Sequence, residues 1–472
     1  MVFNCWTDQA YRQQLYESFE HRVDARMDLI DALLSNATAQ SVVALSLSPF
    51  FRRQYSSITD AINAAIPPRL DATTARRQQE LSLTRLIGPH LPAPQKRPFW
   101  LLALDVTLCP RRFVPTLSDR GFVYQPNLIR GNKPITIGHQ YEALVLLPEL
   151  TLPDGPHWVV PLMICRIATA ETENQVSAEM FNTVLRDDQL PFHSDLSVLV
   201  EDSKYSVANH LGRLFPNDNL VFSEQSCLLL RLSSRPVPAA WPRRSQALRG
   251  TLRPQGPSTW GNPDETCRFS HTNQRGCTYT VQIEAWRNLI MHGIREYRMW
   301  DKPFTLVRVQ LLDENGQLVF KRPMWLIVIG KRRHELSLKV VWHTYRQRYD
   351  AEHFFRFGKQ RLLFTSYQTP NTEHEETWIQ LGQIAYTELW LMRHVAQARL
   401  NPWERYLPQS SAGAATPSQV QRDAERILSL IGTPAKPPKP RGNSPGRAAG
   451  THVPHRKRHP VVKKGKKHVQ TA

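Results

Sequence analysis

Three acidic residues in this sequence stand where phosphoryl-transfer chemistry could use them. Asp105 is the one carboxylate in the nearly continuous apolar run 99–108, and Asp202 closes a second apolar run that begins at Leu196. A bare carboxylate in a buried strand is costly unless a partner such as a bound cation compensates it. For either aspartate alone, a strand-end acid that caps the next helix or faces solvent is the alternative interpretation.

The third acid lies in a segment with a denser pattern. Four residues follow one another at helical spacing: Tyr345, Arg348, Glu352 and Lys359. At 100° per residue they fall within about 60° on one face of a helix, and the opposite face is apolar. Arg348 and Glu352 also form an (i, i+4) pair, so a salt-bridged amphipathic helix is the alternative interpretation of Glu352.

Together the three acids could hold divalent metal ions. Two such ions can activate a water or a 3′-hydroxyl and stabilise the leaving oxygen in phosphoryl transfer. Cations of the magnesium type prefer oxygen ligands, which two aspartates and one glutamate supply without cysteine or histidine. The six cysteines form no C-x-x-C pair, which disfavours structural zinc and a disulfide framework and favours a reduced, cytoplasmic compartment.

The chain is strongly basic. Its 472 residues carry a formal net charge of +19, and eleven Lys and Arg residues with no acid lie in 435–472. Such an excess predicts a polyanionic partner, and nucleic acid is the usual one. Arg52, Arg53, the run 331–333 and the tail could contact DNA, or they could form solvated surfaces. The longest apolar runs are too short to span a bilayer, and the first residues lack a secretory apolar core, so neither a membrane protein nor a secreted protein is expected.

The helices and strands that the sequence predicts around these acids indicate an α/β protein. Residues 1–95 show helical spacing, with helices expected over 8–19, 24–34, 39–47 and 58–65. From 96 to 215, strands are expected over 99–108, 141–147, 158–167 and 196–200, and helices over 176–185 and 206–215. Strands that alternate with helices in this way indicate a mixed sheet flanked by helices.

The remaining segments differ in texture. Residues 216–334 are expected to form a β-rich insertion, with strands over 219–232, 278–286, 304–312 and 324–329. Residues 335–400 return to helix, with one long helix over 337–363 and another over 376–398. The segment 401–434 holds a helix over 418–431, and the Pro-, Gly- and Lys-rich tail 435–472 is expected to be disordered.

The pattern Tyr345-x2-Arg348-x3-Glu352-x6-Lys359, preceded by two strand-end aspartates, resembles the signature of DDE transposases. The resemblance is to the insertion-sequence branch that carries the Y-R-E-K motif, and it covers residues 96–400. It implies a ribonuclease-H-like core with a β-rich insertion between the second aspartate and the glutamate. The strands expected independently over 216–334 agree with this insertion.

The resemblance also implies roles for the acids. In that family the three acids, here Asp105, Asp202 and Glu352, are catalytic and hold two Mg²⁺ ions, for which Mn²⁺ can substitute. The tyrosine, arginine and lysine of the motif contact the transposon-end DNA, and these correspond to Tyr345, Arg348 and Lys359.

Two aromatic positions are implied to contact a base. Some family members stack a flipped base on a tryptophan in the β insertion, where this sequence has Trp325. A core residue of a strand is the alternative for Trp325. Close relatives carry a tryptophan directly after the motif arginine, where this sequence has Tyr349, so the base pocket is expected to differ in detail.

The function implied is that of a bacterial-type, cut-and-paste DNA transposase. It would bind the terminal inverted repeats of its own element with residues 1–95, assemble as a homodimer on paired ends, and cleave and join double-stranded DNA. It would act in the cytoplasm, on the nucleoid, with no membrane partner. The alternatives are a catalytically silent DNA-binding protein derived from a transposase, another ribonuclease-H-like nuclease, and a purely structural basic protein.

Overall fold

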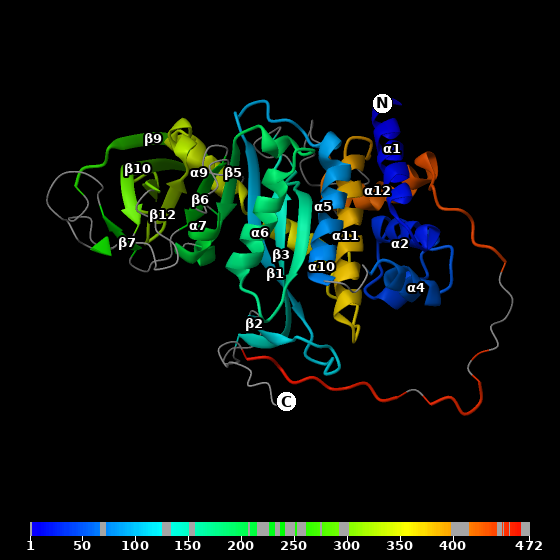
Figure 1. The fold of residues 1–472 in the computed structure, drawn as a ribbon. Helices are drawn as coiled ribbons and strands as arrows, with labels where there is room; N and C mark the ends of the chain where they lie inside the picture. Colours follow the sequence, from blue (N-terminus) through cyan, green and yellow to red (C-terminus); the bar gives the residue numbers. More distant parts are fainter. Residues whose placement is uncertain are drawn as a thin grey trace.

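The computed structural model of the chain describes most of its residues and shows one extended sheet with helices on both faces (Figure 1). The described residues are 2–66, 72–124, 134–150, 156–205, 208–214, 226–231, 237–240, 251–252, 261–273, 276–291, 302–397, 415–440, 446, 448–452 and 454–463. Among them, no helix is long and apolar enough to cross a membrane.

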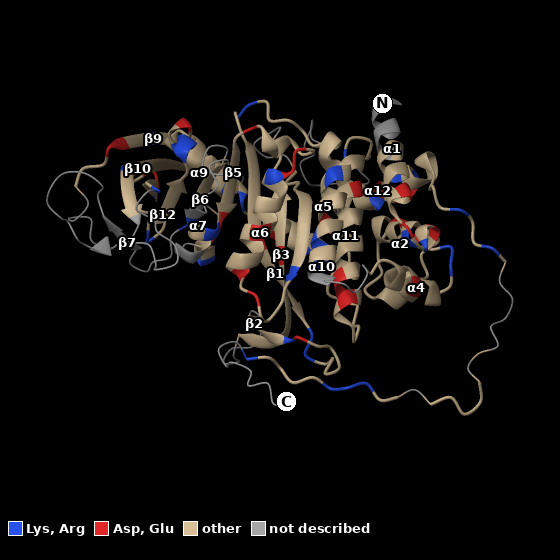
Figure 2. Cartoon of the chain, in the orientation of Figure 1, with Lys and Arg blue, Asp and Glu red and all other residues tan. Residues whose placement is uncertain are grey.

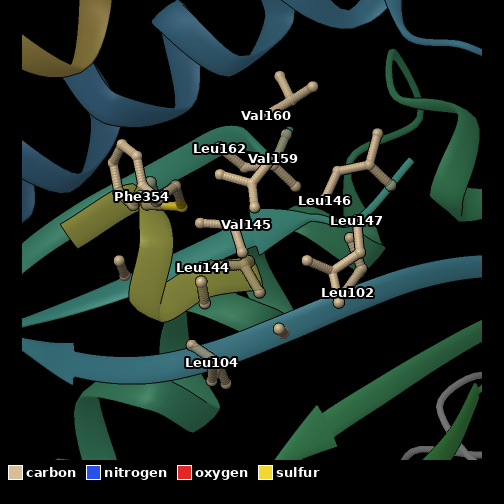
Figure 3. Packing of buried hydrophobic residues seen from close by; sticks show 14 of the residues in the cluster. Leu102, Leu104, Leu144, Val145, Leu146, Leu147, Val159, Val160, Leu162 and Phe354 are labelled. Atoms are coloured by element: carbon tan, nitrogen blue, oxygen red, sulfur yellow. The ribbon is translucent and has the colours of Figure 1, made fainter. Parts of the chain in front are cut away.

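The centre of the sheet is built from the apolar runs of the sequence. Strand β1 (Trp100–Pro110) pairs antiparallel with β3 (Ile135–Leu146) and parallel with β5 (Ser197–Glu201). Strand β4 (Val160–Ile167) pairs with β3, and β2 (Gly121–Tyr124) forms the edge. Leucine and valine side chains from β1, β3 and β4 pack together beneath the helices (Figure 3). The mixed sheet and the buried strand expected over 99–108 are confirmed.

Helices cover both faces of this sheet, as two neighbouring residues of β3 illustrate. Tyr141 reaches Glu375 on α11 (Thr372–Met392), whereas Glu142 reaches Tyr205 on the other face. On the α11 face lie α5 (Ala72–Ile87) and α10 (Asp350–Gln360); on the other face lie α6 (Glu173–Arg186), α7 (Ala208–Leu214) and the 3-10 turn η3 (Ser203–Tyr205). The 3-10 turns η1 (Gly88–His90) and η2 (Pro191–His193) join neighbouring elements.

The N-terminal helices form a further layer on α11. They are α1 (Val2–Ser18), α2 (Val23–Leu34), α3 (Val42–Leu45) and α4 (Ser56–Ala64), and α12 (Pro417–Ile431) packs with them. Arg12 of α1 donates hydrogen bonds to both Asp31 of α2 and Glu388 of α11, and all three side chains are buried. The expected helical character of 1–95 is therefore confirmed, and this layer shares its core with the sheet.

The β-rich segment continues the same sheet. Its strands are β6 (Ser226–Arg231), β7 (Val237–Ala240), β8 (Thr251–Leu252), β9 (Glu265–Thr272), β10 (Thr278–Met291), β11 (Phe304–Leu312) and β12 (Met324–Ile329). The order in the sheet is β2-β3-β1-β5-β6-β12-β11-β10-β7-β8, with β9 on β10. Because β6 pairs parallel with β5, the segment extends the core sheet.

The single long helix expected over 337–363 is wrong. The structure has two helices, α9 (Leu338–Gln347) and α10, separated by a tight turn at Arg348 and Tyr349. There the backbone bonds span three residues: Arg348 N–H donates to the oxygen of Tyr345, and Glu352 N–H donates to that of Tyr349. The turn allows α9 to pack on β9 and β10 while α10 packs on β1 and α11.

Part of the basic tail is docked on the sheet edge. The N–H of His459 donates to the oxygen of Pro115 (2.9 Å), and the N–H of Val462 donates to the oxygen of Arg120 (2.8 Å). The buried Arg120 guanidinium in turn donates to the oxygen of His459 (3.1 Å). The expected disorder is therefore wrong for these residues, because an edge strand offers unpaired backbone groups to an extended chain. Figure 2 shows the basic residues along this path; residues 464–472 lie outside the described residues.

Arg52 and Arg53, between α3 and α4, share one acidic partner within the fold. Arg52 lies 2.6 Å and Arg53 2.8 Å from the carboxylate of Asp28, whose side chain is fully buried. Asp28 lies in α2, so the pair ties the segment before α4 to that helix. These contacts favour the structural interpretation of Arg52 and Arg53 over direct DNA contact.

Candidate active site

Two parallel strands bring the aspartates to one edge. In the β1–β5 pair, Ala103 lies opposite Val200, and each aspartate follows two residues later. Strand β5 ends at Glu201, so Asp202 begins the turn that follows, and its carboxylate accepts a hydrogen bond from the N–H of Ser203 (2.7 Å). Asp105 and Asp202 therefore lie side by side where the two strands diverge.

Arg348 joins Asp105 to the third acid. One guanidinium nitrogen lies 3.2 Å from Asp105 Oδ2, and the other lies 3.4 Å from Glu352 Oε1. The Arg348 side chain is only 12% exposed, whereas that of Glu352 is 40% exposed. The (i, i+4) ion pair anticipated as the alternative is therefore present, and it is part of a bridge between two of the three acids.

The other two motif residues, Tyr345 and Lys359, lie near Arg348 and Asp105. The guanidinium of Arg348 lies over the ring of Tyr345, 5.9 Å from its centroid, and Tyr345 is buried. Burial lowers the pKa of Lys359, and the nearby Cys109 and Asp105 oppose this shift. The four residues expected on one helix face thus lie around Asp105, although the helix that was to carry them is broken.

Burial and two neighbouring acids disfavour the charged form of Asp105, and Arg348 offsets part of this effect. Burial raises the pKa of Asp105; Arg348 and the N–H of Val106 lower it, and the charges of Glu352 and Asp202 raise it further. A carboxylate in this position gains from a cation, and the carboxylate oxygens of Asp105, Asp202 and Glu352 are the ligands that a hard divalent ion prefers. Among the described residues, however, no three ligating side chains converge on a single metal position. Arg348 stands between two of the three acids.

A buried hydrogen bond that the sequence did not reveal lies beneath the aspartates. The hydroxyl of Tyr205, three residues after Asp202, contacts both carboxylate oxygens of Glu142 (2.8 and 2.9 Å), and both side chains are buried. Glu142 lies on β3, so the bond crosses β1 and ties the Asp202 turn to a strand two positions away. Glu142 in the run 141–147 was the only sequence signal, a carboxylate in an apolar strand.

The two expected base-contacting residues differ in exposure. Trp325 is 7% exposed and lies 6.1 Å from Trp286, and Arg308 stacks on both rings. These neighbours are residues of the β-rich segment, as the core interpretation anticipated. Tyr349 is 49% exposed at the start of α10, and the ring of His353 meets it edge to face at 5.2 Å.

A second carboxylate cluster lies past the end of β1. Glu375 accepts hydrogen bonds from Tyr141 (2.8 Å) and Arg111 and lies 2.8 Å from His139 Nδ1. These four side chains are buried. Burial would raise the pKa of Glu375, but the hydrogen bond with His139 and the charge of Arg111 lower it to about 2. The protein itself therefore supplies the hydrogen-bond donors to the Glu375 carboxylate.

The comparison with known families agrees with this arrangement. A family model described as DDE superfamily endonuclease matches residues 14–292. The match spans more than half of the chain, so the chain belongs to the DDE endonuclease superfamily. It includes Asp105 and Asp202 and ends before Glu352. No curated protein matches the chain. Membership makes DNA the implied substrate of a nuclease, and enzymes of this superfamily generally use divalent metal ions.

Proposed function

We propose that the chain is a DNA transposase of the Y-R-E-K group, which cuts the ends of its own element and joins them to target DNA. The observation that supports this most is the grouping of Asp105, Asp202 and Glu352 around Arg348 in a member of the DDE superfamily. A structural basic protein would have no reason to keep the partly buried Asp105 beside two like charges.

In this proposal the three acids hold two Mg²⁺ ions, with Mn²⁺ as a substitute. The bound ions would supply activation of the attacking water or 3′-hydroxyl and stabilisation of the leaving oxygen. Arg348 would leave Asp105 and Glu352 for a DNA phosphate, which a guanidinium binds in a bidentate way. Lys359 would balance charge beside Asp105, and the Tyr205–Glu142 bond would keep the Asp202 turn in place.

The remaining assignments follow from the same proposal. Tyr349 is open to a displaced base, whereas Trp325 would have to leave its packing against Trp286 to reach one. Residues 1–95 would bind the element ends, 96–215 and 335–400 would form the catalytic core, and 216–334 would be the insertion. The segment 401–434 and the tail 435–472 complete the chain. The protein would work as a homodimer on paired ends, in the cytoplasm on the nucleoid.

The test is cleavage of DNA that carries the element ends flanking the gene. The wild type should nick this DNA at the end junction with Mg²⁺ and not with EDTA, and joined products should follow. Glu352→Gln should abolish nicking and keep DNA binding, because it preserves the shape of the side chain and removes its charge. Glu425→Gln is the matched control, since Glu425 is an exposed acid on α12.

Each other outcome selects an alternative. Tight end binding without cleavage under any divalent metal would identify a silent DNA-binding protein. Metal-dependent cutting without joining would identify another ribonuclease-H-like nuclease.

A further inference from the structure

A surface built by β9 and α9 gathers cations and aromatic rings outside the carboxylate site. Its members are Phe269 and His271 of β9 and Lys339, Trp342, His343 and Arg346 of α9. The two β9 residues are two positions apart and so share one face of the strand. The three polar members on α9 follow at i, i+4 and i+7, so they share one face of the helix, and all three are exposed. Basic segments on α9 beside β9 are visible in Figure 2.

Ring contacts hold the charged groups in place. The ammonium of Lys339 lies 5.2 Å from the ring centroid of Phe269, and the guanidinium of Arg346 lies 4.6 Å from that of Trp342. Trp342 is 2% exposed and Phe269 is partly buried, so these rings are fixed parts of the fold. A cation over an aromatic face is attracted by the ring and keeps its outer side free for an anion.

The surface has an excess of positive charge. Arg346 Nη1 lies 2.6 Å from His271 Nε2, so the arginine donates to a neutral imidazole. Burial lowers the pKa of His343 to about 4, and the charges of Arg346 and Lys339 contribute to this shift. Among the described residues, no carboxylate forms an ion pair with Lys339, His343 or Arg346.

Other arginines of the same region are neutralised. Arg308 pairs with Glu284, Arg287 with Glu265, and Arg332 with Glu335. In contrast to these three arginines, Lys339 and Arg346 of α9 have no acidic partner among the described residues. They are available to an anion from outside the chain.

We propose that this β9–α9 surface binds the phosphodiester backbone of double-stranded DNA that leads to the carboxylate site. Helix α9 ends at Gln347, directly before Arg348, which touches Asp105, so one helix leads from the surface to the site. From Lys339 to Arg348 the helix rises roughly 14 Å, at about 1.5 Å per residue. This matches the length of roughly four base pairs, at about 3.4 Å each. The inference rests on the proposed function in that DNA is the ligand. Because Trp342 is buried, the contact is to phosphates and not to bases.

The test removes the three exposed polar groups of α9 together, of which Lys339 and Arg346 carry a positive charge. The triple variant K339Q/H343Q/R346Q leaves Phe269 and Trp342 in place, and its folding is checked by circular dichroism and thermal unfolding. The control triple variant K96Q/K321Q/R356Q removes three exposed cations elsewhere. Binding of an end-containing duplex is measured in EDTA at several salt concentrations, so that no cleavage occurs.

The expected result is a change in salt dependence. Each lost phosphate contact lowers the slope of log K against log salt by about one, so the triple variant should lose about 2 to 3 from the slope, whereas the control triple should keep it. Affinity near 0.1 M salt should fall by about 10- to 100-fold. An unchanged slope with affinity within about twofold of wild type would overturn the inference.

A second readout is local to the surface. Nuclear magnetic resonance of histidine ring protons in the full chain, assigned with H343Q, reports the protonation of His343. Its pKa should rise from about 4 when the duplex binds, because a phosphate replaces repulsion by attraction. No change on binding would count against contact at this surface.

These measurements separate the two proposals. If the triple variant loses salt dependence as predicted but the wild type shows no metal-dependent cleavage, the DNA-binding surface stands and the transposase assignment is refuted. If the wild type cleaves but the triple variant keeps its slope and DNA leaves the His343 titration unchanged, the transposase assignment stands and the DNA-binding surface is refuted.

Discussion

Asp105 and Glu375 are two carboxylates near the same strand with opposite surroundings. Glu375 is fully buried and held by Arg111, His139 and Tyr141, and its pKa is lowered to about 2. Asp105 is 20% exposed, has one long ion pair with Arg348, and has a raised pKa. Glu375 receives its hydrogen-bond donors from the protein and therefore stabilises the fold. Asp105 has fewer such donors and lies beside two other acids, so it can accept a cation from outside.

The largest expected effect separates activity from stability at Asp105. Asp105→Asn should lower metal-dependent cleavage on the order of 10⁴-fold, because it removes a proposed metal ligand. It should not lower the free energy of unfolding at neutral pH, because burial, together with the charges of Glu352 and Asp202, disfavours the charged carboxylate that the change removes. Cleavage rates and urea unfolding measure the two quantities. A large loss of stability would mean that Asp105 is a structural residue.

The same change at Glu375 should act on stability. Glu375→Gln leaves the buried Arg111 without its acid, which should cost about 3–5 kcal/mol in the free energy of unfolding. Tyr141→Phe is the milder comparison, with an expected cost of about 1–3 kcal/mol for one hydrogen bond to a charged group. Urea unfolding followed by circular dichroism checks both. Equal costs for the two variants would contradict the dominant role of the Arg111–Glu375 pair.

The Arg111–Glu375 pair should also make the stability of the protein depend on pH in the acid range. Because the pKa of Glu375 is lowered in the folded state, its stabilising contribution is present above its unfolded value of about 4.5 and is lost as pH falls toward 2. The contribution amounts to about 3 kcal/mol. The stability difference between wild type and Glu375→Gln should therefore shrink by about this amount from pH 6 to pH 2. Urea unfolding at several pH values tests this, and a constant difference would refute it.

The smallest effect concerns the bridge at Asp105. Arg348→Gln should tighten Mn²⁺ binding to the DNA-free chain by about tenfold, because it removes a cation that stands between two acids. Titration followed by electron paramagnetic resonance measures this affinity. Arg356→Gln is the control, since Arg356 is an exposed cation on α10, the helix that carries Glu352. Equal tightening in both variants would mean that only the overall charge matters.

The parts of the candidate site that depend on short sequence patterns could be predicted from the sequence. The apolar runs that carry Asp105 and precede Asp202 predicted two strands, and helical spacing grouped Tyr345, Arg348 and Glu352. That the two strands are adjacent and parallel came only from the structure. The break at Arg348 was not predictable, because it arises from α9 and α10 packing on different partners.

Other features depend on residues that are distant in the sequence. The Tyr205–Glu142 bond and the Glu375 cluster join segments that only the folded chain brings together. Strand β9 was missed because its sequence, ETCRFSHT, is mostly polar and half exposed. The tail was expected to be free because composition does not show which sheet edge is open to it.

The buried link from Arg12 to Asp31 and Glu388 has a consequence for synthesis of the chain. On the ribosome, residue 388 emerges long after the first helices, at about 5–20 residues per second. For roughly 20 s to a minute, α1 and α2 must wait with Arg12 and their apolar faces uncovered. Helices α1 and α2, although made before α11, thus reach their final state only after it, and nascent chains should depend on chaperones during that interval.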